Sequence, residues 1–326
     1  MDPDPAPPHE GADSGPYGRG GLPGVQALPL RWPAVTSSIH ASGPADPRGS
    51  APAPGHGPAP EAAASDSAPP ALGSFVALGD SFTEGMSDPL PGGDGYRGWA
   101  DLLAARLSAR TEGFRYANLA VRGKLIGQIA ADQVDAAAAM GADLVTLVGG
   151  LNDALRPRCD MDHVTARLSE SVAKLAPSCR RLVLMRSPGR AGQVLERYRP
   201  RMERLYAVVD ELAERHGALV VDLYAGDVLA DPRLWADDRL HLTSEGHRRV
   251  AEAVWQRLGF PAEFDWRAPL PPADRPSLLA RRAADLRFAR AHLLPWIGRR
   301  LTGRSSGDGR SPKRPELAPL TGTDAR

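Results

Sequence analysis

The sequence lacks several features that mark particular classes of protein. No run of about 18 uninterrupted apolar residues occurs in the 326-residue chain, so we expect no transmembrane helix. The N-terminal stretch MDPDPAPPHEG is acidic and rich in proline, and it has neither the basic n-region nor the apolar h-region of a secretory signal. These absences predict a cytoplasmic protein.

The chain also has a small net charge and few cysteines. The 40 basic residues nearly balance the 39 acidic ones, so nothing indicates a nucleic-acid partner. The two cysteines, Cys159 and Cys179, flank a helix-like segment that would hold their sulfurs roughly 25 Å apart. A disulfide needs Cα atoms within about 7 Å, and two cysteines are too few for a structural zinc site. We therefore predict two free thiols and no metal or other cofactor.

The first 72 residues form a separate compositional region. They contain sixteen of the 32 prolines, together with many glycines, alanines and serines. Such a segment buries too little apolar surface to offset its ordering entropy. We predict that residues 1–72 are a disordered tail.

Between residues 73 and 258, strand-like apolar runs alternate with amphipathic helical runs. The strand-like runs are SFVALG, FRYANLAV, DLVTLVGG, RLVLMRSP and ALVVDLYA. Strands separated by helices favour a parallel sheet covered on both faces, with right-handed crossovers. The pattern predicts an α/β fold: a doubly wound, five-stranded, three-layer αβα domain.

The chemically distinctive residues follow the predicted strands. Ser81 in GDSFTEG comes after the first strand, Gly123 in NLAVRG after the second, and Asn152 in GGLND after the third. Asp238 and His241, in DDRLHLTSEG, come after the fifth. Because the sites of such folds form beyond the carboxyl ends of the strands, we expect these residues to converge at one edge.

Their chemistry fits a serine nucleophile. A serine hydroxyl needs a base to take its proton and donors to stabilise an oxyanion. Asp238 can reach back to Nδ1 of His241 and leave Nε2 to act as that base. The backbone N–H of Gly123 and the amide of Asn152 are candidate oxyanion donors. Taken singly, each motif also fits an ordinary turn or a glycine with positive φ.

Neighbouring polar residues receive other interpretations. Asp80 should hold the loop, because its side chain should point away from that of Ser81, and Asp237 is a less favoured alternative to Asp238. His163, His216 and His247 fall in helical stretches, and we interpret His247 as a helix-face residue rather than a base. The chain also lacks the G-x-S-x-G elbow around Ser81, which argues against an α/β-hydrolase fold.

In their order along the chain, the motifs resemble the four blocks of the SGNH hydrolases, also called the GDSL esterase/lipase family. The motifs are GDSxxxG, a glycine after the next strand, GxND and a late DxxH. The resemblance implies a flavodoxin-like fold and a cofactor-free serine esterase acting on a small-molecule ester. It makes Ser81 the nucleophile, His241 the base and Asp238 the residue that orients the base. It places backbone N–H groups of Ser81 and Gly123 and the side chain of Asn152 in the oxyanion hole.

The residues after 258 differ in composition from the predicted α/β domain. We predict a strap and a basic amphipathic helix over 259–304 and a disordered tail over 305–326, an arrangement similar to C-terminal extensions of some actinobacterial SGNH proteins. The helix has an arginine-rich face and a leucine side. It fits either a peripheral contact with an anionic membrane or partner, or docking on the hydrolase domain, which we favour because its aromatic residues can anchor packing.

Three functions therefore remain after the sequence is read. The first is a carboxylic ester hydrolase that acts as a monomer. The second is a non-catalytic protein that binds a membrane or partner through its basic C-terminal helix. The third is an acyltransferase, which would use the same acyl-enzyme and differ only in the acceptor.

Overall fold

A computed structural model of the chain describes residues 71–90, 92, 95–189, 196–225, 227–274, 277–295 and 305–320. The predicted N-terminal tail lies outside these ranges except for residues 71 and 72. The described residues all belong to one of two contact-defined units, Ala62–Arg326.

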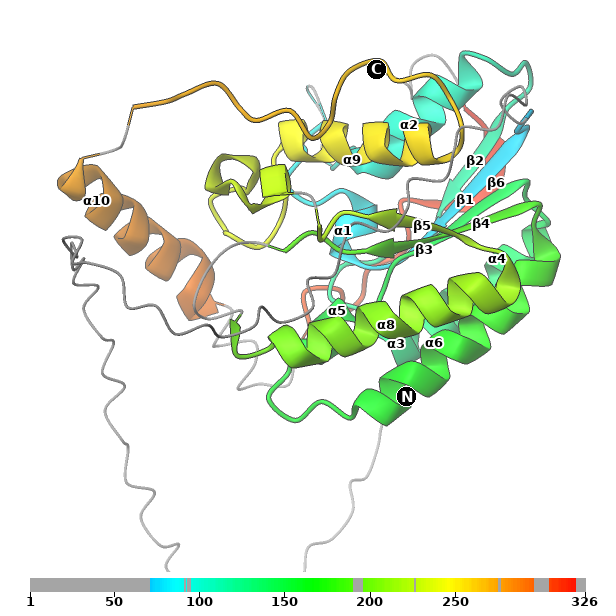
Figure 1. The fold of residues 1–326 in the computed structure, drawn as a ribbon, viewed down its shortest axis with the longest axis horizontal. Coiled ribbons are helices and arrows are strands. Elements are labelled where there is room, and N and C mark those ends of the chain that lie inside the picture. The colour runs from blue at the N-terminus through cyan, green and yellow to red at the C-terminus, as the bar shows by residue number, and fades with distance from the viewer. Residues whose placement is uncertain are drawn as a thin grey trace, which may run out of the picture. The chain divides into compact units, whose positions relative to one another are not determined.

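A six-stranded sheet forms the centre of this unit, with strand order β5-β4-β3-β1-β2-β6 (Figure 1). The first five strands pair in parallel, in the flavodoxin-like order read from the far edge. The predicted doubly wound α/β fold is therefore confirmed. The strands are β1 Ser74–Leu78, β2 Arg115–Asn118, β3 Leu144–Leu147, β4 Arg181–Arg186, β5 Leu219–Asp222 and β6 Arg314–Pro319.

Helices cover both faces of the sheet. Helices α2 and α9 lie on one face, and α3, α6 and α8 lie on the other (Figure 1). A π-helical turn, Ala130–Val134, joins α3 to α4. The α-helices are α1 Ser81–Glu84, α2 Gly98–Ser108, α3 Ile126–Ile129, α4 Asp135–Met140, α5 Leu151–Ala154, α6 Met161–Leu175, α8 Arg199–His216, α9 Ser244–Arg257 and α10 Leu278–Phe288.

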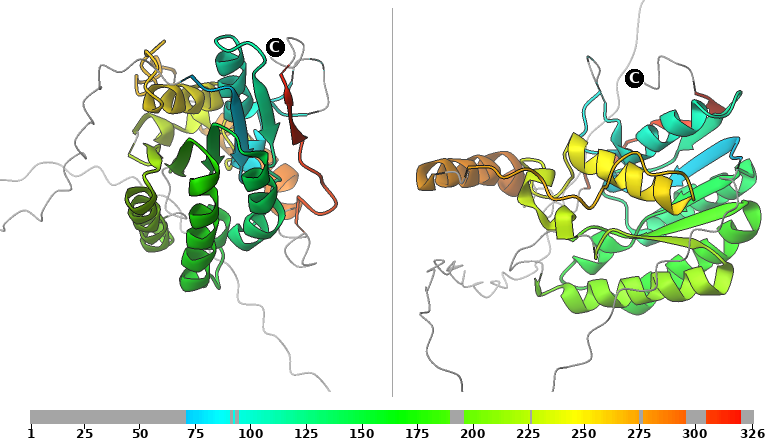
Figure 2. Two further views of the ribbon diagram at one scale, coloured as in Figure 1. Left: turned by 90° about the vertical axis from the view of Figure 1, so that its right-hand side faces the viewer. Right: turned by 45° about the horizontal axis from the view of Figure 1, so that its top comes forward.

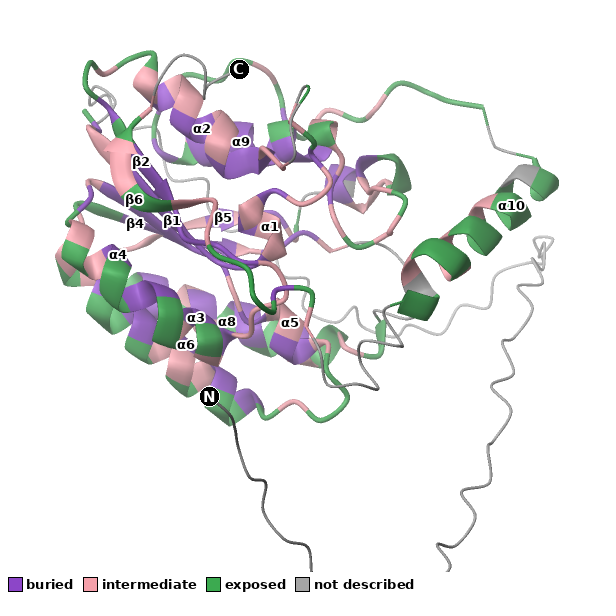
Figure 3. Ribbon diagram, turned by 180° about the vertical axis from the view of Figure 1, so that it is seen from behind, coloured by how far each residue is buried: buried purple, intermediate pink, exposed green. Residues whose placement is uncertain are grey.

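Two hydrophobic cores lie against the two faces, and β1 contributes to both. Phe75 and Ala77 point into the core beneath α2 and α9, whereas Val76 and Leu78 point into the opposite core. This alternation follows from the two-residue period of a strand. Strands β1, β2, β3 and β4 are mostly buried, and Figure 3 shows buried inward faces on these helices, whereas the edge strand β6 is intermediate or exposed. The run FVAL, Phe75–Leu78, is apolar throughout because both faces of the strand are covered.

The sixth strand corrects the prediction of a disordered tail from residue 305. Strand β6 pairs antiparallel with β2, with Tyr116 opposite Ala318 (Figure 2). Pro315 and Pro319 are tolerated because β6 is an edge strand, where a missing N–H need not break a ladder. Composition alone predicted disorder, but pairing with a distant strand orders residues 305–320.

Helix α10 also differs from the favoured expectation. Figure 3 shows α10 mostly exposed, and its leucines Leu278, Leu279 and Leu286 are 59–80% exposed, so they do not pack against the domain. The helix does contact Arg239, which pairs with Asp285 and lies over the ring of Phe288.

Two further observations concern the described residues as a whole. No helix among them is long and apolar enough to cross a membrane. Cys159 and Cys179 are both unpaired, as predicted.

Candidate active site

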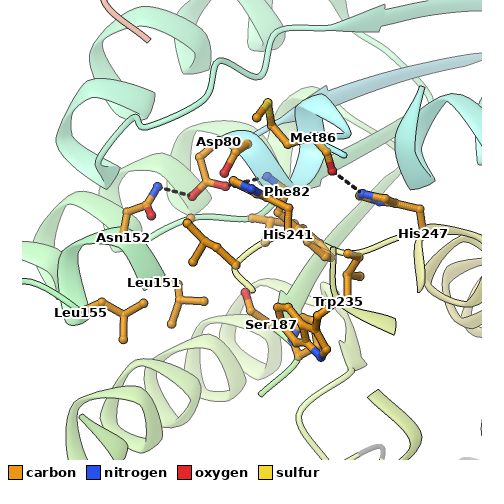
Figure 4. Close-up of a pocket in the computed structure, with 16 residues that line it drawn as sticks. Asp80, Phe82, Met86, Leu151, Asn152, Leu155, Ser187, Trp235, His241 and His247 are labelled. Atoms are coloured by element: carbon orange, nitrogen blue, oxygen red, sulfur yellow. Dashed lines mark hydrogen bonds between the residues drawn. The ribbon is translucent and has the colours of Figure 1, made fainter. Parts of the chain in front are cut away.

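A pocket lies at the carboxyl edge of the parallel strands (Figure 4). Its cavity measures about 60 Å³. Four segments supply its lining residues: α1 after β1, α5 after β3, the segment after β4, and the loop before α9. The lining residues are Asp80, Ser81, Phe82, Met86, Val148, Gly149, Leu151, Asn152, Leu155, Ser187, Pro188, Trp235, Leu240, His241, Leu242 and His247.

The loop before α9 joins an aspartate to a histidine. Nδ1 of His241 lies 2.6 Å from Oδ2 of Asp238. Oδ1 of the same carboxylate accepts the backbone N–H groups of Leu240 at 2.9 Å and His241 at 3.0 Å. Arg239 adopts a φ of 56°, a left-handed turn that folds the loop back on itself. The D-x-x-H spacing therefore brings the two side chains together, as the sequence predicted.

The electrostatics of this pair favour an ionised aspartate. Burial acts to raise the pKa of Asp238, but the hydrogen bonds and charge of His241 and the two backbone N–H groups together lower it to about 2. The carboxylate is therefore charged across the neutral pH range. A charged carboxylate on Nδ1 fixes the ring tautomer and leaves Nε2 as the acceptor nitrogen.

Ser81 begins α1, and Asp80 caps that helix. The Asp80 side chain accepts the Phe82 N–H at 3.0 Å, and its other oxygen accepts an N–H of the Asn152 amide at 3.0 Å (Figure 4). Burial raises the pKa of Asp80 to about 6, although the Phe82 N–H opposes this shift. Asp80 thus holds the loop, as expected.

The Asn152 amide is fully engaged in this arrangement. Besides Asp80, it donates to the carbonyl of Lys124 at 3.1 Å. An amide NH₂ has two hydrogens, so both point at protein acceptors here. Asn152 lies in the pocket with Ser81 and His241, but an oxyanion would have to displace one of these bonds.

Gly123 does not line the pocket. Its φ of 74° meets the expectation of a glycine-specific conformation. The space beside its Cα is filled by Ser305 and Ser306, whose hydroxyl oxygens would lie 2.5 and 2.9 Å from an added Cβ. The structure therefore brings together four of the five predicted site residues and leaves Gly123 beneath the C-terminal segment.

His247 proves to be buried and fully hydrogen-bonded. Nδ1 accepts the N–H of Trp99 at 3.3 Å, and Nε2 lies 3.0 Å from the carbonyl of Met86, to which it donates (Figure 4). Burial lowers the pKa of His247 to about 4. With both nitrogens engaged, this ring is a structural link between α9 and the loop after α1 rather than a base.

Sequence reasoning missed several lining residues. Ser187, Trp235 and Leu240 carried no motif, and they reach the pocket only through the tertiary fold. Within the described ranges, no cluster of three or more His, Cys, Asp or Glu side chains is arranged to hold a metal ion.

Comparison with known proteins places this geometry in a family. The model of the GDSL-like lipase/acylhydrolase family matches residues 77–249, more than half of the chain. The acetylxylan esterase of Geobacillus stearothermophilus is 27% identical over 161 residues, which cover 45% of this chain and 74% of the esterase.

A solved structure has the same fold. A variant of Axe2, an acetyl xylan esterase from Geobacillus stearothermophilus, is 23% identical and matches with a TM-score of 0.50 over 60% of this chain and 100% of its own. LAE5, an alpha/beta hydrolase enzyme from the metagenome of Lake Arreo, Spain, is 25% identical with a TM-score of 0.48, over 57% and 95% of the two chains. The chain belongs to the GDSL-like lipase/acylhydrolase family and is a carboxylic ester hydrolase.

Proposed function

We propose that this enzyme hydrolyses its ester through an acyl-enzyme on Ser81, with His241 as the base and Asp238 orienting it. The observation that carries the proposal is the 2.6 Å contact between Asp238 and Nδ1 of His241, in a pocket that Ser81 also lines. Nδ1 is committed to the carboxylate, so Nε2 is the ring nitrogen available for the serine proton.

The bond changes then balance without a cofactor. Oγ of Ser81 forms a bond to the ester carbonyl carbon as its proton passes to Nε2 of His241. The bond from that carbon to the alkoxy oxygen breaks, and the same proton goes to the leaving alcohol. Water repeats the sequence on the acyl-enzyme and releases the acid.

Oxyanion stabilisation is assigned to the N–H of Ser81 and the amide of Asn152. We propose that the developing oxyanion displaces the neutral Lys124 carbonyl from that amide, since a charged acceptor forms the stronger hydrogen bond. The backbone N–H of Gly123 stays a prediction as a third hydrogen-bond donor to the oxyanion. Removing such a donor typically costs roughly 100- to 1000-fold in turnover, and we expect Asn152→Ala to fall in that range.

Covalent labelling tests the role of Ser81. A fluorophosphonate probe should label the enzyme, and Ser81→Ala should abolish both labelling and turnover. Ser187→Ala is the matched control, because this second pocket serine should leave labelling intact. Labelling that survives in Ser81→Ala and disappears in Ser187→Ala would move the nucleophile to Ser187.

The pocket further favours an ester of a short alkyl acid. Most lining side chains are apolar, and the polar Asp80, Asn152 and His247 are engaged with protein partners. Nδ1 of His241 is bonded to Asp238, and its Nε2 is reserved for the serine proton. Few groups remain to bind sugar hydroxyls. A cavity of roughly 150 Å³ holds benzene, so one of about 60 Å³ fits an acyl group of a few carbons.

A nitrophenyl ester series from acetate to palmitate tests this preference. We expect kcat/KM to rise roughly tenfold from acetate to butyrate, because each buried methylene contributes about 0.8 kcal/mol. Longer chains should lose this gain once the cavity is full. A maximum at acetate, or a higher kcat/KM on acetylated xylo-oligosaccharides than on nitrophenyl butyrate, would contradict the assignment.

A further inference from the structure

A lysine from the C-terminal segment fills a cage of oxygen atoms next to the pocket. Nζ of Lys313 donates to the carbonyls of Glu84 at 2.8 Å, Tyr96 at 3.1 Å and Arg97 at 2.7 Å, and to Oδ2 of Asp101 at 2.8 Å. The Lys313 side chain is only 21% exposed. An ammonium group has three N–H donors, and here they meet four acceptors.

The carbonyls converge because two stretches of backbone are pressed together. A Cβ on Gly85 would lie 2.5 Å from the Arg97 carbonyl oxygen and 2.7 Å from Gly98 Cα. Such close approach aims several carbonyl oxygens at one point. Without a cation there, these partly buried acceptors would repel one another and lack a donor. Lys313 removes that cost.

One member of the cage is the end of the helix that Ser81 begins. Helix α1 has four residues, so nearly all its backbone groups are terminal and need outside partners. Asp80 caps its start, and the Thr83 carbonyl accepts Nδ2 of Asn118 at 3.0 Å. Lys313 supplies the donor for the next carbonyl, that of Glu84.

The two donors at the helix end are joined through buried polar groups. Asp101 accepts the hydroxyl of Tyr116 at 2.7 Å, and that hydroxyl accepts the other Asn118 hydrogen at 3.0 Å. Lys313, Asp101, Tyr116 and Asn118 therefore form a closed chain that begins and ends on α1. A side chain that fixes this chain also fixes the helix.

The C-terminal segment touches the neighbouring loop as well. The Ser305 hydroxyl contacts the Gly123 carbonyl at 3.4 Å. Arg122, beside that glycine, forms an ion pair with Glu84 and donates its backbone N–H to the same carboxylate at 2.6 Å. The segment thus rests on the two loops that follow β1 and β2.

We propose that Lys313 is a positioning residue for Ser81, acting through the carbonyl end of α1. This inference rests on the proposed role of Ser81 as the nucleophile. Lys313 touches neither the substrate nor the reacting atoms. It fixes the rotation and depth of the one-turn helix on which the serine hydroxyl is presented.

The test compares steady-state kinetics of Lys313→Met with those of the wild type, well below both melting temperatures. A misplacement of about 1 Å can cost roughly 100-fold in rate, so we expect kcat to fall roughly 10- to 100-fold with KM unchanged. The rate of fluorophosphonate labelling of Ser81 should fall in parallel. Lys313→Arg keeps the charge and the donors and should recover part of both rates. It also provides a second variant for the comparison if Lys313→Met folds poorly.

Two variants of β6 separate positioning from general loss of stability. Glu316→Gln changes an exposed residue of the same strand and should match the wild type. Leu317→Ala removes apolar packing of β6 and should lower the melting temperature while kcat stays near wild type.

The kinetic results distinguish failure of the positioning role from failure of the proposed function. Wild-type kcat in Lys313→Met, or an equal kcat loss in Leu317→Ala at an equal drop in melting temperature, overturns the positioning role. If Ser81→Ala abolishes turnover in the same assay, the proposed function stands in either case. If Ser81→Ala remains active, the proposed function itself fails.

Discussion

At the scale of single residues, the pocket holds two histidines with opposite roles. His241 is bonded to a carboxylate through one ring nitrogen and lines the pocket. His247 has both ring nitrogens bonded and is 1% exposed. The sequence pointed to His241 through the D-x-x-H spacing and assigned His247 to a helix face. It contained no signal for the carbonyl of Met86 and the backbone N–H of Trp99 that engage His247, because both residues lie more than 100 positions away in the sequence.

The buried His247 predicts a pH dependence of stability. Its pKa is about 4 in the fold and about 6.5 when unfolded, so between these values the unfolded chain binds the extra proton. The contribution of His247 to stability therefore falls as pH drops from 6.5 towards 4, by about 2 kcal/mol at pH 5 relative to pH 7. Asp80 acts oppositely, since its raised pKa makes the folded state bind the proton between about 3.8 and 6.

Urea unfolding of the wild type and His247→Gln at pH 7 and pH 5 checks this prediction. The wild type should lose more stability on acidification than the variant. His163→Gln, on the exposed face of α6, serves as the control and should behave like the wild type. Equal losses in wild type and His247→Gln would show that His247 titrates normally in the folded protein.

At the scale of elements, the approach of α1 to α2 depends on two glycines with positive φ. Gly85 ends α1 at a φ of 94°, and Gly98 begins α2 at a φ of 78°. A Cβ on Gly98 would lie 2.2 Å from Gly85 Cα, a contact that no side-chain rotation can relieve. These glycines allow the backbone carbonyls to converge on Lys313.

This contact predicts unequal costs for two similar substitutions. Gly113 has a φ of 70° with open space around its Cα, so Gly113→Ala should cost only the left-handed backbone penalty, about 1–2 kcal/mol. Gly98→Ala adds a backbone clash and should cost roughly 3 kcal/mol or more. Denaturant unfolding of both variants measures the difference, and similar free energies would mean that the two helices part without strain.

At the scale of the whole molecule, local patterns predicted the five parallel strands and the edge at which the site forms. Each strand has a buried apolar run and each site residue follows a strand, so short-range sequence carries this information. The sixth strand lacked such a signal. SPKRPELAPL contains three prolines and no alternation, and its order depends on pairing with β2 and on the oxygen cage around Lys313. Long-range pairing of this kind leaves little trace in a single sequence.

The cage around Lys313 also bears on how the enzyme matures. Lys313 is separated from Glu84 by 229 positions, so during synthesis the ribosome adds it long after the helix that begins with Ser81 has emerged. Domains made of early segments can collapse while translation continues. The nascent chain would then carry Ser81 on a helix whose last carbonyl still lacks its lysine donor, and the full rate of hydrolysis would be reached only as the last strand joins the sheet.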